Sequence, residues 1–300
     1  MSVEAAVKGQ EHYSLISQAT EHQKAGRLLE AKNIYLSLLA GNPDDANALH
    51  LLGMLSHQAG DSEQGAELIE KAVKLLPDFP LFLNNLGHVY LSLYQLEKAE
   101  DVFAQAMRLD SNMVESLYGL GECYRRKGDL QRAAGNIQLV LESAPQHTAA
   151  IVSLGQIHFQ HGTTEKALEL FDIALQIEPE HFDARFHAAR AYAAASEYEK
   201  SIEILRQLLK ECPEHVPCYN NLGNAYMAML QFDKARQAYQ NVVDHDPDDV
   251  GARYNIALAN VALKQQDTAI EHLEYGLKID LDNVRVQQLL SDLKINVVEN

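Results

Sequence analysis

The stretch "CYNNLGNAYMAML" (residues 218–230) repeats, with few changes, the stretch "LFLNNLGHVYLSL" (residues 81–93). Aligning the two places Asn220 opposite Asn84, 136 positions earlier, which is four times 34. A segment that returns at a whole multiple of a shorter period indicates an internal repeat. The paired asparagines therefore have two alternative explanations: they form a ligand site, or they recur because every repeat packs in the same way.

The prolines follow the same period. They stand at Pro43, Pro77, Pro145, Pro179, Pro213 and Pro247, with a constant spacing of 34 except for one double interval of 68. In this frame the repeats start at His12, Ala46, Pro80, Val114, Thr148, Phe182, Val216 and Val250. We therefore expect eight tandem repeats of this period over 12–283, without insertion or deletion, after a lead-in of residues 1–11.

Two positions of the repeat hold only small side chains, and a third position holds only large apolar or aromatic side chains. The eighth position holds Ala19, Gly53, Gly87, Gly121, Gly155, Ala189, Gly223 and Ala257. The twentieth holds Ala31, Gly65, Ala99, Ala133, Ala167, Ser201, Ala235 and Ala269. The twenty-fourth holds Tyr35, Ile69, Phe103, Ile137, Phe171, Leu205, Tyr239 and Leu273. We expect the small side chains to face the large ones across an interface that recurs in every repeat.

Between these positions apolar residues recur at helical spacing, which predicts two short amphipathic helices in each repeat. A glycine separates the two helices in half of the repeats, at Gly26, Gly60, Gly128 and Gly162. A tight turn there needs a residue that tolerates positive φ. One such hairpin cannot bury its apolar stripe, but a stack of hairpins can, so the predicted fold is an all-α solenoid.

The motif Leu222-Gly223-x-x-Tyr226, with Ala235 and Tyr239 downstream, resembles the tetratricopeptide repeat (TPR) family. The likeness extends over all eight repeats, although the first-helix tryptophan of the family is missing because the chain has no Trp. The resemblance implies a right-handed superhelix of helix-turn-helix repeats. It also implies that the first helices line a concave face, along which a partner peptide lies.

Residues 284–300 follow the last repeat and predict a C-terminal capping helix. Their apolar side chains fall on one helical stripe: Val286, Leu289, Leu290, Leu293 and Val297. Such a helix would cover the open face of the last repeat and present polar residues to solvent.

The charge balance limits the class of partner. The 42 acidic against 25 basic side chains give a net charge of −17, which disfavours nucleic acid and an anionic membrane surface. No apolar run approaches the length needed to span a bilayer, and the first residues do not resemble a secretory signal. Three cysteines are too few for a disulfide framework. We expect a cytoplasmic chain without membrane insertion.

In the family, the second, fifth, ninth and twelfth positions of each repeat line the groove. The resemblance therefore implies the peptide-binding residues Asn84, His88, Tyr118, Glu122, Arg125, Gln156, Phe159, Phe186, Arg190, Asn220, Asn224 and Tyr254. Amide side chains can pair with a peptide backbone, and aromatic rings supply rigid contact area. The alternative for the asparagines is that they pair with neighbouring repeats.

Two patterns known within the family fit poorly. A carboxylate clamp needs Lys or Arg at the fifth and ninth positions, and Arg190 alone meets that condition. An asparagine ladder at the sixth position is only partial, with Asn85, Asn221 and Asn255 interrupted by other residues. Neither pattern therefore identifies the ligand.

The sequence thus predicts a non-enzymatic scaffold that binds a protein or peptide in its groove, with self-association left open. The alternative is a substrate-targeting module of, or partner to, a glycosyltransferase or sulfotransferase. Residues 26–60 favour this alternative, because they are similar to the arrays that precede catalytic domains in bacterial O-GlcNAc-transferase-like glycosyltransferases and in sulfotransferases.

No catalytic, cofactor or metal site is expected. Cys212, His215 and Cys218 share one loop but lack CxxC spacing and a fourth ligand. His158, His161 and Glu165 are separated by the turn glycine, so no single helix holds them on one face.

Overall fold

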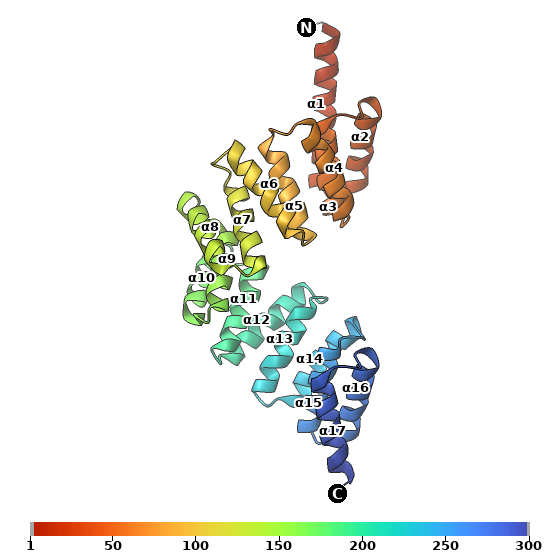
Figure 1. Cartoon of the computed structure of the whole chain (residues 1–300), viewed down its shortest axis with the longest axis vertical. Coiled ribbons are helices and arrows are strands. Elements are labelled where there is room, and N and C mark those ends of the chain that lie inside the picture. Colours follow the sequence, from red (N-terminus) through yellow and green to blue (C-terminus); the bar gives the residue numbers. More distant parts are fainter. Residues whose placement is uncertain (1–2, 299–300) are drawn as a thin grey trace. The chain divides into compact units, whose positions relative to one another are not determined.

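The computed structural model describes the backbone of residues 3–298 and the side chains of residues 10–295. Over that backbone range the chain forms 17 α-helices and no strand. Figure 1 shows the helices following one another along the chain in pairs. The first helices of the successive pairs are α1 (Val3–Lys24), α3 (Ala46–Gln58), α5 (Pro80–Ser92), α7 (Val114–Lys127), α9 (Thr148–Gln160), α11 (Phe182–Ala194), α13 (Val216–Ala228) and α15 (Val250–Ala262). The second helices are α2 (Leu28–Gly41), α4 (Ser62–Leu75), α6 (Leu96–Leu109), α8 (Leu130–Ser143), α10 (Thr164–Ile177), α12 (Tyr198–Glu211), α14 (Phe232–His245) and α16 (Gln266–Ile279), and α17 (Val284–Val298) follows them.

The helices form two compact units, unit 1 (Met1–Ser153) and unit 2 (Leu154–Asn300), and the boundary falls within α9. From α3 to α15, every first helix begins at a repeat start of the 34-residue frame. Helix α1 begins at Val3, so it also includes most of the segment expected as a lead-in. None of the helices between residues 3 and 298 combines the length and apolar character that crossing a membrane demands.

The expected pairing of small with large side chains is confirmed within each unit. A Cβ added at Gly87 would stand 2.5 Å from the ring of Phe103, and one added at Gly223 would stand 2.5 Å from the ring of Tyr239. The same pairing brings Gly53 against Ile69, Gly121 against Ile137 and Gly155 against Phe171. The glycine at the eighth position thus lets the large side chain of the second helix touch the backbone of the first.

The turn between the two helices of a pair has one conformation throughout. The four turn glycines have φ between 74° and 93°, as expected. The remaining pairs place other residues in the same left-handed region: Tyr94, Ser196, Leu230 and Lys264, with φ between 57° and 63°. The turn is therefore set by the packing of the helices, and glycine only makes it less strained.

The first helices form a layer in each unit. In unit 1 α3 contacts α5, and α5 contacts α7, in addition to the contacts of each with its own second helix. In unit 2 α11 contacts α13 in the same way. Side chains at matching positions of successive first helices therefore lie next to one another on a shared surface, which we call the first-helix face.

Helix α17 packs against α16 as the predicted cap. Val286, Leu290 and Leu293 are buried against the last repeat, and Leu289 is half-buried beside them. The side chain of Val297 lies outside the described residues. The apolar end of unit 2 is thereby covered.

Candidate interaction surface on the first helices

All twelve residues expected to bind a peptide lie on first helices. Asn84 and His88 belong to α5, while Tyr118, Glu122 and Arg125 belong to α7. In unit 2, Gln156 and Phe159 belong to α9, Phe186 and Arg190 to α11, Asn220 and Asn224 to α13, and Tyr254 to α15. Their surroundings separate them into residues that join repeats to one another and residues that remain available to a ligand.

Asn84 joins repeats of unit 1. Its side chain is only 5% exposed, and its Oδ1 accepts a hydrogen bond of 2.9 Å from the hydroxyl of Ser116 on the next first helix. Its Nδ2 donates to Oδ1 of Asn85 at 3.2 Å, and Nδ2 of Asn85 donates to Nε2 of His50 on the previous first helix at 2.8 Å. For Asn84 the structure therefore shows the inter-repeat alternative.

His50 is the buried end of this chain of hydrogen bonds. Its ring stacks on Phe82 with the centroids 4.4 Å apart. Because the amide of Asn85 donates to it, Nε2 carries no proton and the ring is neutral. Burial disfavours the imidazolium and lowers the pKa of His50 to about 4.

Glu122 is the centre of a second buried cluster in unit 1. Arg125 holds its carboxylate with two hydrogen bonds, Nε to Oε1 at 2.9 Å and Nη2 to Oε2 at 2.8 Å. The hydroxyl of Ser153, on the next first helix, donates to Oε1 at 2.7 Å. Ser153 also contacts the hydroxyl of Tyr118 at 3.3 Å. The carboxylate therefore links two repeats.

The electrostatics of the Glu122 cluster match its geometry. Burial alone would raise the pKa of the Glu122 carboxyl, but the hydrogen bonds and charge of Arg125, assisted by Ser153, shift it below its usual value. Burial, reinforced by the negative charge of Glu122, raises the pKa of Tyr118 to about 12. The cluster is an ionised, internally satisfied pair with little capacity left for a ligand.

His88 is half-buried and makes an edge contact with the ring of Phe103, with the centroids 5.0 Å apart. Burial lowers the pKa of its imidazole. It is thus mainly a packing residue of unit 1.

Arg190 of unit 2 is in a different situation. Its guanidinium carbon lies 5.4 Å from the ring centroid of Phe159 and 5.9 Å from that of Phe186. Nη1 lies 3.4 Å from Nδ1 of His187. Burial lowers the pKa of this half-buried guanidinium, and no carboxylate among the described side chains pairs with it. A partly desolvated cation beside two rings is therefore left without a counter-charge.

Asn220 occupies the position in its repeat that Asn84 occupies in unit 1, but its neighbour differs. The position of Ser116 relative to Asn84 corresponds to Ala252 relative to Asn220, and an alanine cannot donate a hydrogen bond. Asn220 is half-buried, and Asn224 is exposed while accepting a hydrogen bond of 2.7 Å from the Tyr239 hydroxyl. In unit 2 the amide of Asn220 therefore has no equivalent structural role.

The two remaining predicted residues are also accessible to some degree. Gln156 and Tyr254 are half-buried, and Tyr254 packs against the core cluster beneath α17. The first-helix face of unit 2 thus offers amide, aromatic and cationic groups.

His215, in the loop before α13, caps the N-terminal end of that helix. Nδ1 of His215 accepts a hydrogen bond of 3.3 Å from the backbone N–H of Cys218 and lies 3.1 Å from its sulfur. Burial raises the pKa of the Cys218 thiol to about 12, so it is protonated at neutral pH. Within the described part of the chain, no group of three or more His, Cys, Asp or Glu side chains is placed to hold a metal ion.

Several residues of these clusters were not among the peptide-binding residues predicted from the sequence. His50, Asn85, Ser116 and Ser153 complete the buried hydrogen bonds of unit 1. For Ser116 the sequence offered one signal, a hydroxyl at a position where most other repeats have an apolar or small residue.

Three models of the tetratricopeptide repeat match this chain. One matches residues 16–80, 84–148 and 132–180, another matches residues 158–222, and a third matches residues 216–249. The "Uncharacterized protein ycf37" of Pyropia yezoensis is 30% identical over 77 residues, which are 26% of this chain and 43% of that protein.

Solved structures share the fold. A chain of the APC/C hetero-tetramer Cut9-Hcn1 aligns with 96% of this chain and 57% of its own length, at a TM-score of 0.74 and 20% identity. A tetratricopeptide repeat protein from Parabacteroides merdae covers 83% of this chain and 98% of its own, at a TM-score of 0.59 and 19% identity. PilF of Pseudomonas aeruginosa covers 71% of this chain and 97% of its own, at a TM-score of 0.61 and 13% identity.

This chain spans about half the length of the Pyropia protein and of the Cut9-Hcn1 chain that it matches. At 13–20% identity the structural likeness describes the fold alone. The repeat models, however, cover more than half of the sequence, and the helical pairs follow the same 34-residue period. The chain is a member of the tetratricopeptide repeat family.

Proposed function

We propose that the chain is a non-enzymatic scaffold that binds a protein or peptide segment on its first-helix face. Proteins of the tetratricopeptide repeat family bind protein or peptide partners, which supports this general role. The site that we propose lies in unit 2, where the predicted residues are accessible, rather than at Asn84 and Glu122, which are buried between repeats.

One observation carries the proposal: the half-buried Arg190 lies within 6 Å of the ring centroids of both Phe159 and Phe186, without a carboxylate partner in the described region. Arginine and aromatic side chains contribute most to binding where a partner excludes water from them. A carbonyl or carboxylate oxygen of a bound segment would accept the guanidinium N–H groups, and its apolar side chains would cover the rings.

Affinity purification with mass spectrometry tests the proposal. The bait is the full chain, compared with the double variant Phe186→Ala and Arg190→Ala. The matched control is Ile173→Ala and Lys166→Ala, which removes one apolar and one cationic exposed side chain from α10. We expect a direct partner to be retained by the native chain and the control and lost from the first-helix variant.

Circular dichroism of all three baits checks that the fold is intact. A set of partners that the folded first-helix variant retains as well as the native chain would contradict the proposal. Recovery of a glycosyltransferase or sulfotransferase as the partner would favour the more specific alternative, a module that targets such an enzyme.

A further inference from the structure

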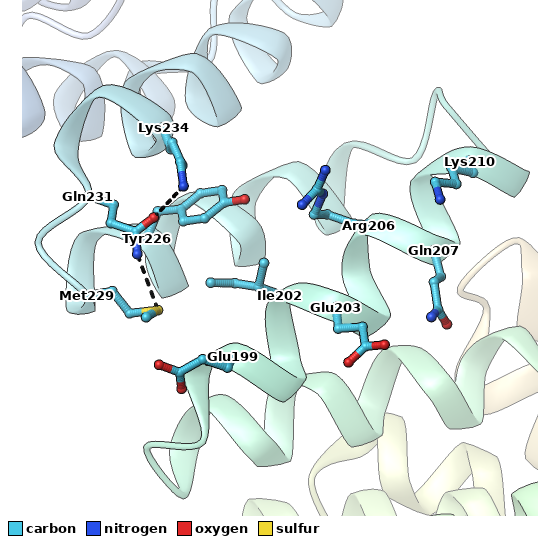
Figure 2. Close-up of a pocket in the computed structure, with 10 residues that line it drawn as sticks. All are labelled: Glu199, Ile202, Glu203, Arg206, Gln207, Lys210, Tyr226, Met229, Gln231 and Lys234. Atoms are coloured by element: carbon cyan, nitrogen blue, oxygen red, sulfur yellow. Dashed lines mark hydrogen bonds between the residues drawn. The ribbon is translucent and has the colours of Figure 1, made fainter.

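A groove between α12 and α14 of unit 2 is separate from the first-helix face. Figure 2 shows it, with α12 on one side and the end of α13 and the start of α14 on the other. Its main hollow has a volume of about 500 Å³, and a neighbouring hollow of about 330 Å³ shares Arg206, Tyr226 and Lys234 with it. These three residues thus lie at the centre of the groove.

The same place in other repeats has a recurring arrangement of side chains. In these repeats the side chain at the nineteenth position is a Lys or Arg, and its cation lies over the ring of the tyrosine at the eleventh position. The distances from the cation to the ring centroid are 5.2 Å for Lys98 over Tyr90, 4.5 Å for Arg132 over Tyr124, 5.0 Å for Lys200 over Tyr192 and 5.5 Å for Lys234 over Tyr226. The repeats therefore serve as internal controls for one another.

In unit 1 the preceding second helix adds a carboxylate to this arrangement. The Tyr90 hydroxyl donates to Oε1 of Glu70 at 2.6 Å, and the Tyr124 hydroxyl donates to Oε1 of Glu100 at 2.9 Å. In both repeats the carboxylate accepts the phenolic hydrogen, and the charge of Glu100 also acts on Arg132 beside the Tyr124 ring. The tyrosine hydroxyl is thereby satisfied.

In unit 2 one repeat places a carboxylate near its tyrosine, and another repeat does not. Asp172 lies 20 positions before Tyr192, as Glu70 lies 20 positions before Tyr90, and its charge acts on both Tyr192 and Lys200. The residue 20 positions before Tyr226 is Arg206. Where Tyr90 and Tyr192 have an acceptor and a negative charge, Tyr226 has a donor and a positive charge.

The result is a cluster of hydrogen-bond donors. Figure 2 shows the Tyr226 hydroxyl pointing toward Arg206, with the Lys234 ammonium beside the ring and the Glu203 carboxylate turned away. Lys234 donates to Oε1 of Gln231 at 2.8 Å. None of Arg206, Lys210 and Lys234 forms an ion pair within the described side chains, although the chain as a whole carries a net charge of −17.

The groove also has an apolar lining, which narrows the class of ligand. Ile202 and Met229 line the main hollow, and Tyr219 and Leu222 line its neighbour. The carboxylates of Glu199 and Glu203 lie at the main hollow and would repel a polyanion such as a nucleic acid. A protein segment in which a carboxylate stands beside an apolar side chain matches both the donors and the lining.

We propose that the groove between α12 and α14 docks an acidic, partly apolar protein segment, whose carboxylate takes the place that Glu70 occupies beside Tyr90. Arg206 and Lys234 would bind that carboxylate, and the Tyr226 hydroxyl would donate to it. This site is additional to the first-helix site, so the two can be removed independently.

Isothermal titration of the full chain tests the proposal with a hexapeptide of alternating Leu and Glu, acetylated and amidated at its ends. Its comparison is the same peptide with Gln in place of Glu. We expect the glutamate peptide to bind and the glutamine peptide to bind at least tenfold more weakly. Absence of binding by the glutamate peptide, or equal binding of the two, would overturn the proposal.

Charge reversal assigns the binding to the groove. Arg206→Glu recreates the carboxylate found at Glu70 and is compatible with the fold, because the chain already contains that arrangement. We expect this variant to bind the glutamate peptide at least tenfold more weakly than the native chain does. Arg108→Glu, at an exposed arginine of α6, changes the net charge equally and should alter the affinity less than twofold. Equal weakening by both variants would show attraction to net charge alone and overturn the proposal.

Two further measurements complete the test. The methyl NMR signal of Met229 should shift when the glutamate peptide is added, and an unchanged signal would place the peptide elsewhere. Inorganic phosphate should compete weakly; if it binds more tightly than the peptide, the groove is a free-anion site and not a docking site. The double variant Phe186→Ala with Arg190→Ala should keep the affinity for the glutamate peptide, and loss of that affinity would place the peptide on the first-helix face and overturn the proposal.

Discussion

A Cβ atom added at Gly87 would stand 2.5 Å from Cε1 of Phe103, closer than real Cβ contacts allow. The same ring lies against the next first helix, where a Cβ added at Gly119 would stand 2.4 Å from its Cζ. Phe103 is completely buried and enclosed by two helix backbones. The ring therefore cannot move aside for a larger residue on either helix.

Gly87→Ala should destabilise unit 1 in spite of the better helix propensity of alanine. Overpacking of a rigid site costs about 1–3 kcal/mol, whereas replacing a helical glycine by alanine gains at most about 1 kcal/mol. The control is Gly135→Ala in α8, where a Cβ meets nothing within 4 Å. We expect the urea midpoint to fall for Gly87→Ala and to rise slightly for Gly135→Ala. Equal shifts in the same direction would contradict the role of the close contact.

Glu122→Ala should strongly destabilise the α7–α9 contact inside unit 1, because it leaves the half-buried Arg125 without its counter-charge. Breaking a buried pair on one side costs about 3–5 kcal/mol. The double variant with Arg125→Leu should lose less than the single variant, since it removes both charges. A double-mutant cycle by chemical denaturation measures the difference. A double variant less stable than Glu122→Ala would show that the pair is not coupled as described.

The position of each helix and the pairing of small with large side chains follow from the sequence, because both recur once in every repeat. The two different roles of the residue at the fifth position do not follow from the sequence of a single repeat. Asn84 and Asn220 are the same residue at the same repeat position, but Asn84 accepts a hydrogen bond from Ser116, whereas the residue equivalent to Ser116 for Asn220 is Ala252. Whether an amide joins repeats or faces a ligand depends on a side chain of the next first helix, and not on the position of the amide in its own repeat. The Glu70-to-Arg206 change is likewise visible only when whole repeats are superimposed.

The buried His50 should make stability depend on pH. Its pKa is lowered to about 4 from an ordinary value of 6.5, so the unfolded chain binds the proton more tightly. The stabilisation by the neutral ring is fully present above pH 6.5 and is lost as the pH falls from 6.5 to about 4. The free energy of unfolding should fall by up to about 1.4 kcal/mol per pH unit in that window.

His50→Gln keeps an acceptor for Asn85 and removes the titrating group. Urea denaturation of this variant between pH 4 and 7 should show a shallower pH dependence than that of the native chain. An unchanged slope would assign the pH dependence to other groups.

Leu230→Gly should stabilise unit 2. Leu230 is 71% exposed and has a φ of 58°, a left-handed conformation that costs an ordinary residue about 1–3 kcal/mol. Glycine removes this strain and loses about 0.4–1 kcal/mol through the entropy of the unfolded chain. We expect a net gain of about 1 kcal/mol in thermal or urea unfolding. The control is Leu139→Gly, an exposed leucine inside α8, which should lose about 1 kcal/mol. A loss in both variants would mean that the Leu230 side chain contributes packing.

The asparagines at the fifth position of two repeats, Asn84 and Asn220, should respond differently to the same substitution. Asn84→Ala leaves the buried Ser116 hydroxyl without its acceptor, and an unsatisfied buried group costs about 1–3 kcal/mol. Asn220→Ala removes no such bond, because Ala252 stands in the place of the serine, and should change stability by less than about 0.5 kcal/mol. Binding of a partner identified with the native chain should instead weaken for Asn220→Ala. Urea denaturation and titration with that partner measure the two effects, and a large stability loss for Asn220→Ala with unchanged binding would reverse the assignment, making both asparagines packing residues.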